Sequence, residues 1–164
     1  MDQYSKILII IYLILALLMG YRVFKNIKAS RLVGDNADSF KKRTSKFEYL
    51  MLGILLVFAI LNTFNGLKNK DKMSLIFSVI IVFISIMFLA TLFDKFYIFP
   101  EGIVANGQVV SFKELKKWGF DTENGNLVLI IKKNHEEQTI TVQSRKEDIE
   151  KINKLIRKYK LGKE

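Results

Sequence analysis

The chain has 164 residues, of which 50% are hydrophobic, and its 26 Lys and Arg against 16 Asp and Glu give a formal net charge of +10. It contains no cysteine and only one histidine, which excludes disulfides, thiolate zinc sites, iron–sulfur clusters, cysteine nucleophiles and histidine-rich metal sites. This length allows at most one small folded domain in addition to membrane elements.

The first apolar run, residues 7–24, reads ILIIIYLILALLMGYRVF. A cleaved signal peptide is the alternative, but the run is too long for the apolar part of such a peptide and no A-x-A-type cleavage site follows it. We therefore expect an uncleaved signal anchor. Tyr21 would lie at the membrane interface, and the long side chain of Arg22 would reach the headgroups.

Residues 25–48 form the most basic short segment of the chain, and its middle, GDNADS, is turn-like. The triplet Lys41, Lys42 and Arg43 stands between Phe40 and Phe47. Aromatic residues beside basic ones also occur in RNA-binding proteins, but one isolated triplet is more typical of a juxtamembrane anchor on anionic lipid. We predict that the triplet contacts lipid headgroups or a partner, and that the protein binds no nucleic acid.

The second and third apolar runs, residues 49–66 and 75–93, are separated by the short polar segment LKNKDKMS. The third run has no charged residue, and as a helix it would extend roughly 28 Å, close to the ~30 Å thickness of bilayer hydrocarbon. Asn62 in the second run could bond a neighbouring helix, and a substrate role is its alternative. No ionisable residue lies deep in any run, which argues against a transporter acting alone.

The distribution of Lys and Arg predicts the orientation, because basic loops stay in the cytoplasm. The segment between the first two runs carries far more basic residues than the N-terminus or residues 67–74. We therefore expect a multi-pass protein of the cell membrane. Its N-terminus would lie outside, and the basic loop 25–48 and all residues after the third run would lie in the cytoplasm.

From residue 95 the pattern changes to short apolar runs separated by turn residues. Pro100 and Gly102 fit a tight turn, while Asn106-Gly107 and Asn124-Gly125 are strong hairpin signals. We expect a membrane domain over residues 1–94 and a small α+β domain over residues 95–164. The latter would be an antiparallel hairpin sheet of five to six strands covered by one amphipathic helix.

That final helix has its own sequence signals. Ser144 and Glu147 fit a capping box, and apolar residues then recur at helical spacing up to Tyr159. Basic residues flank this stripe, namely Lys151, Lys154, Arg157 and Lys158, and we predict that they contact headgroups or a partner. We expect the apolar face to cover the sheet; a helix lying on lipid is the alternative.

These hairpins and the final helix, directly after membrane helices, resemble the pleckstrin-homology-like domains of uncharacterised bacterial membrane proteins. The Glu101-Gly102-Ile103 step, Trp118 and the strand entry Asn126-Leu127 carry the likeness. The resemblance implies a seven-stranded fold with an aromatic anchor in the last helix, a place that Tyr159 takes here. Phosphoinositide binders of that fold have basic residues in the first hairpin loop, whereas residues 105–108 have none.

The sequence contains no catalytic constellation. His135 and Glu136 lie in a polar turn, and a solvated turn residue is a better reading of His135 than a general base. We expect no enzyme, no metal and no cofactor. The first hypothesis is a membrane-anchored binding or scaffold module that presents its domain to a protein or to anionic lipid; the alternative is a small accessory or immunity-type subunit acting within the membrane. Nothing in the sequence indicates an oligomeric state.

Overall fold

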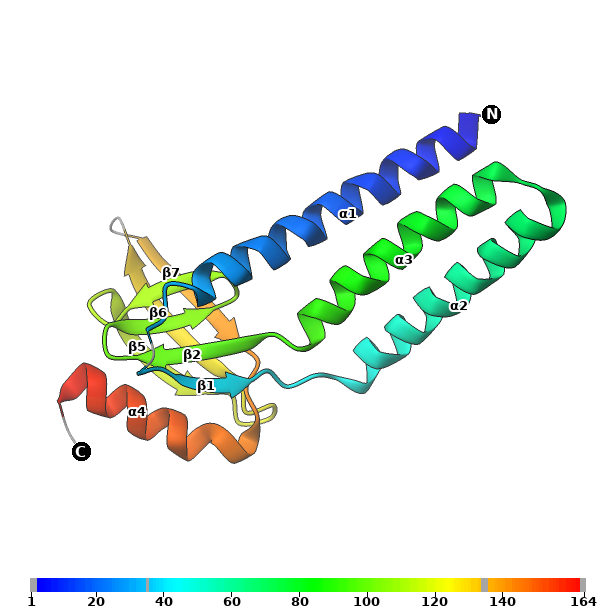
Figure 1. Cartoon of the computed structure of the whole chain (residues 1–164). Helices are drawn as coiled ribbons and strands as arrows, with labels where there is room; N and C mark the ends of the chain where they lie inside the picture. Colours follow the sequence, from blue (N-terminus) through cyan, green and yellow to red (C-terminus); the bar gives the residue numbers. More distant parts are fainter. Residues whose placement is uncertain (1–2, 35, 134–135, 163–164) are drawn as a thin grey trace. The chain divides into compact units, whose positions relative to one another are not determined.

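The computed structural model describes residues 3–34, 36–133 and 136–162 (Figure 1). The chain forms two compact units, each built from two separate stretches of sequence. The membrane unit consists of Met1–Val23 and Thr44–Leu92, and the domain unit of Phe24–Arg43 and Phe93–Glu164.

Three helices of the described chain are long and apolar enough to cross a membrane, which is consistent with a multi-pass membrane protein. They are α1 (Gln3–Ser30), α2 (Lys46–Asn69) and α3 (Lys72–Leu92). The three predicted apolar helices are confirmed, and α1 continues beyond the apolar run into the basic segment. Long polar side chains such as Lys are good helix formers, so a helix need not end where apolarity ends.

The helices α2 and α3 form a hairpin with well-defined ends. Ser45 and Glu48 make a reciprocal capping box at the start of α2: the Glu48 amide donates to Ser45 Oγ at 3.2 Å, and the Ser45 amide donates to Glu48 Oε2 at 2.7 Å. Near the loop, Gly66 is buried against Leu75. Small residues allow such close approach of membrane helices.

The domain unit contains two antiparallel sheets, ordered β1-β2-β3-β4 and β5-β6-β7. The strands of the first sheet are β1 (Asp38–Lys41), β2 (Lys95–Phe99), β3 (Gly102–Ala105) and β4 (Gln108–Ser111). Those of the second are β5 (Leu115–Phe120), β6 (Leu127–Lys133) and β7 (Glu136–Val142). The 3₁₀ turn η1 (Lys146–Asp148) and the helix α4 (Ile149–Leu161) follow. Asn106 and Gly107 both have positive φ, as a type I′ hairpin turn requires.

The strand count differs from the expectation of five to six strands in one sheet: the described residues hold seven strands in two sheets. The additional first strand, β1, lies in the segment that we expected to be a loop. It pairs with β2 in the register Asp38↔Ile98 to Lys41↔Lys95. A four-residue strand, DSFK, with one buried apolar side chain carries no alternation from which it could be predicted.

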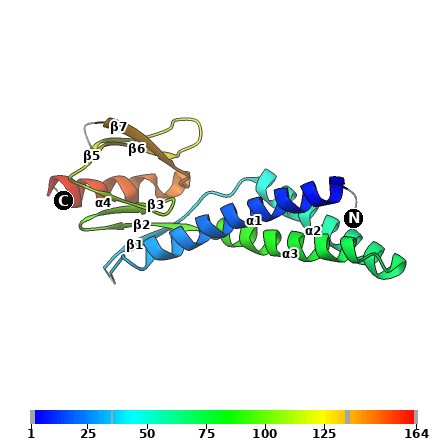
Figure 2. The same cartoon turned by 90° about the horizontal axis from the view of Figure 1, so that it is seen from above.

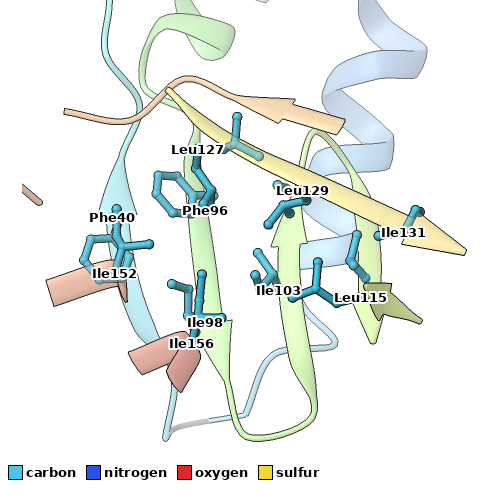
Figure 3. Packing of buried hydrophobic residues seen from close by; sticks show 13 residues of the cluster. Phe40, Phe96, Ile98, Ile103, Leu115, Leu127, Leu129, Ile131, Ile152 and Ile156 are labelled. Atoms are coloured by element: carbon cyan, nitrogen blue, oxygen red, sulfur yellow. The ribbon is translucent and has the colours of Figure 1, made fainter. Parts of the chain in front are cut away.

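The core of the domain unit lies between the sheets and α4 (Figure 3). Phe40 from β1 is 3% exposed and stacks on Phe96 of β2, with ring centroids 5.3 Å apart. Ile152 and Ile156 of α4 are fully buried in the same cluster. In Figure 2, α4 lies between the two sheets. The expected packing of its apolar face on the sheet is confirmed.

The capping box expected at Ser144 and Glu147 is wrong. Ser144 is fully buried, and its hydroxyl donates to the carbonyl of Gly125 at 2.6 Å. The helix α4 begins later, and its N-cap Asp148 makes no side-chain capping bond. A buried hydroxyl needs a partner, and the turn before β6 supplies one for Ser144. The capping box of this chain stands instead at the start of α2, at residues 45–48.

Candidate functional site

The structure gives the three residues of the basic triplet different environments. Lys41 is exposed at the end of β1. Lys42 is 8% exposed, and its Nζ lies 3.6 Å from Asp94 Oδ2. Arg43 turns to another part of the domain unit, where its Nη1 donates to the carbonyl of Asn124 at 2.7 Å. The triplet is therefore not one continuous surface, because its members alternate between solvent and protein.

Asp94 is the centre of a polar cluster that the sequence analysis missed. Besides Lys42, it accepts a hydrogen bond from Asn26 Nδ2 of α1 at 2.5 Å. Its carbonyl also accepts from the Lys42 amide at 3.3 Å, which extends the β1–β2 pairing by one residue. Asp94 thus holds the end of β1, the start of β2 and the C-terminal part of α1 together. A lone carboxylate directly after a long apolar run is the signal that could have found it.

A hollow in the domain unit brings Arg43 together with the segment before α4. Its lining residues are Arg43, Arg145, Lys146 and Glu147, and its volume is about 380 Å³. We call this hollow the basic pocket. Among the described residues, the carboxylate in its lining is that of Glu147, which contacts Arg145 at 3.2 Å. Of the three basic residues, only Arg43 was predicted from the sequence to contact headgroups or a partner.

The four predicted basic residues of α4 have different environments: one forms an ion pair, and the other three are exposed to solvent. Lys151 lies 3.1 Å from Asp38 Oδ1 and 5.3 Å from the centre of the Phe40 ring, so it fastens α4 to β1. The three exposed residues are Lys154, Arg157 and Lys158, which we call the α4 basic face. All three are exposed, and within the described residues none of them has an ion-pair partner.

Asn62 in the membrane unit bonds within its own helix, since its Nδ2 donates to the carbonyl of Phe58 at 2.9 Å. The polar contact between α2 and α3 is made by Thr63 and Ser78 instead, whose hydroxyl oxygens lie 2.5 Å apart. Ser78 is buried and also lies 3.1 Å from the carbonyl of Ala59. This contact stabilises the hairpin, and it involves no ionisable group.

The residues considered as a general base or as metal ligands do not form a catalytic or metal site in the described part of the chain. His135 lies outside the described residues. Glu136 is exposed at the start of β7, and neighbouring Glu137 pairs with Lys116. The hydrogen bond and charge of Lys116 hold the pKa of Glu137 below its usual range. Among the described residues, no group of three or more His, Asp or Glu could hold a metal ion.

Residues 94–161 match a family model described as a domain of unknown function, DUF5673. No curated protein and no solved structure matches the chain.

The matched stretch begins at Asp94 and ends with α4, so it contains β2 to β7 but not β1. In this structure the first sheet is completed by a strand from before the α2–α3 hairpin. Two of the features described above, the Asp94 cluster and the basic pocket, therefore combine residues of the matched stretch with residues 26, 42 and 43 outside it.

Proposed function

We propose that this protein is a membrane-anchored, non-enzymatic binding module that presents its domain unit to a protein or anionic lipid partner. The observation that carries the proposal is the pairing of β1 with β2. These strands belong to one sheet, yet the whole α2–α3 hairpin lies between them in the chain. The domain unit is thus built into the anchor rather than attached by a linker.

This connectivity has a thermodynamic consequence for binding. Short segments, residues 42–45 and 93–94, join the α2–α3 hairpin to the paired strands β1 and β2. Within these segments Lys42 lies close to Asp94. A domain held at a surface in this way meets partners in the same membrane at a high effective concentration. Its surface therefore needs only modest intrinsic affinity to be occupied.

The pairing also supports the proposed orientation. Two paired strands must lie on the same side of a bilayer, so an α2–α3 hairpin that crosses the membrane twice returns the chain to the side it left. The segment before α2 is strongly basic, which favours the cytoplasmic side of the cell membrane, with the N-terminus outside. Sheets of four and three strands followed by one helix support a pleckstrin-homology-like fold for the domain unit.

The α4 basic face is the surface proposed for partner contact. A photoreactive residue in place of Lys154 in the full chain should give a reproducible adduct in native membranes, and mass spectrometry would tell a lipid adduct from a protein one. The control places the same residue at Val109, which is exposed on β4. Reversing two charges with Arg157→Glu and Lys158→Glu should weaken the adduct severalfold. Equal labelling from both positions, unchanged by charge reversal, would contradict the proposal.

The alternative is an accessory or immunity-type subunit acting within the membrane. It requires residues 1–94 alone to retain activity in cells and an Asn62→Leu variant to be impaired. Because the Asn62 amide already bonds its own helix, no contact among the described residues favours this alternative over the first proposal.

A further inference from the structure

The basic pocket has the composition of an anion site. Arg43, Arg145 and Lys146 line it together with a single carboxylate, that of Glu147. Its volume of about 380 Å³ is at the low end of the range for ligand pockets. A small group such as a phosphate fits such a hollow better than a large organic ligand does.

The pocket is held in shape by contacts between segments that lie far apart in the chain. Arg43 is fixed to the turn before β6 by its hydrogen bond to the Asn124 carbonyl. The next carbonyl, that of Gly125, accepts from the fully buried hydroxyl of Ser144. The turn therefore connects Arg43 on one side with the Arg145-Lys146 segment on the other, which reduces the backbone ordering that ligand binding requires.

Gly125 allows Lys146 to lie close to this turn. Its φ of +73° is in the left-handed region, which favours glycine, and a Cβ at this position would lie 2.7 Å from Lys146 Cγ. The aliphatic part of Lys146 thus packs on the turn, and the same side chain contributes to the lining of the pocket.

The nearby carboxylates do not cancel the positive charge. Glu147 contacts Arg145, but the two side chains are 71% and 44% exposed, so their attraction is weak and an anion can compete for Arg145. Asp121 is engaged by its own turn, where it accepts from the Glu123 amide at 2.9 Å. Hydrogen bonds within that turn, with a smaller contribution from the charge of Lys146, hold the pKa of Asp121 below its usual range.

We propose that the basic pocket binds the phosphate group of an anionic lipid headgroup. The inference rests on the proposed function, because it gives that function a ligand and a place. Arg43 lies three residues before α2 begins at Lys46, a distance of at most about 10 Å in extended chain. If α2 enters the bilayer there, Arg43 stays close to the headgroup layer. A guanidinium group can bind two phosphate oxygens at once.

The experiment uses the detergent-solubilised full chain, titrated with dioctanoyl phosphatidylglycerol or, for comparison, dioctanoyl phosphatidylcholine, with bound lipid counted by native mass spectrometry. The pocket variant is Arg145→Gln with Lys146→Gln. Its matched control, Lys132→Gln with Lys133→Gln, removes two positive charges from exposed positions at the end of β6. A third variant, Lys154→Gln with Arg157→Gln, which we call the α4 variant, tests the α4 basic face separately. We expect the pocket variant to lose about tenfold in affinity for the anionic lipid and the control to change less than twofold.

Four results would overturn this inference. Equal losses of affinity in the pocket variant and its control would show that the lipid is attracted by the net charge of the protein and does not bind at a defined site. A loss confined to the α4 variant would move lipid binding to the α4 basic face and leave the proposed function standing. Displacement of the lipid by inorganic phosphate at the same concentration would make the pocket a site for soluble phosphate. If the wild-type chain shows no preference for the anionic lipid while the α4 photoadduct is a protein, the pocket proposal fails and the proposed function does not.

Discussion

Phe40 and Phe47 look equivalent in the sequence, since they stand on either side of the basic triplet, but the structure separates them. Phe40 is 3% exposed and stacks on Phe96, whereas Phe47 is 66% exposed in the first turn of α2. Truncating a buried phenylalanine to alanine costs about 3–5 kcal/mol, and most surface substitutions stay within about 0.5 kcal/mol. We therefore expect Phe40→Ala to destabilise the domain unit strongly and Phe47→Ala to leave it almost unchanged.

Trp118 provides the assay, because it is the only tryptophan in the chain and its Nε1 donates to Asn153 of α4 at 3.1 Å. Its fluorescence in the detergent-solubilised full chain reports thermal unfolding of the domain unit. For a unit of this size, a loss of 3–5 kcal/mol lowers Tm by roughly 12 °C or more. Equal Tm values for the two variants would refute the reasoning, since β1 would then not belong to the folded domain.

Two further predictions test local geometry in the domain unit. Gly102→Ala would place a Cβ 2.2 Å from the Val110 carbonyl oxygen across the β3–β4 pair, so it should lower Tm, whereas Gly119→Ala in β5 meets nothing within 4 Å and should not. Lys116→Gln should return the pKa of Glu137 toward its usual range, because Lys116 is the main cause of its depression. NMR titration of the Glu137 carboxyl measures this. A lowered carboxyl pKa adds stability that is present at neutral pH and is lost as the pH falls through that pKa. The free energy of unfolding of the variant should therefore change less with pH in the acidic range.

The membrane helices and most hairpins could be predicted because their signals are local. An uncharged apolar run such as residues 75–93 has few alternatives to a spanning helix. Asn106-Gly107 forms the expected hairpin turn because both residues adopt the positive φ that this turn needs. The apolar stripe of α4 predicted its packing, since Ile152 and Ile156 recur at helical spacing and are both buried.

The features that could not be predicted depend on tertiary contacts. The same S-x-x-E pattern forms a capping box at Ser45 but not at Ser144, where a buried carbonyl competes for the hydroxyl. Nothing in the spacing of Arg43 and Arg145 indicates that they line one hollow. Of the predicted basic residues, Lys42 and Lys151 are tied to Asp94 and Asp38, which only the pairing of β1 with β2 makes possible.

The same pairing makes a prediction about which residues suffice for folding. A chain of residues 94–162 alone lacks β1, so it leaves β2 as an open edge and uncovers Phe96, which is fully buried in the intact protein. Joining residues 36–42 to 94–162 through Asn-Gly replaces the α2–α3 hairpin by a two-residue turn that suits the antiparallel register. We expect the joined chain to be soluble, with cooperative unfolding of Trp118 fluorescence, and the shorter chain to aggregate. If both fold with the same Tm, β1 contributes nothing to the core, and the domain is merely attached to its anchor.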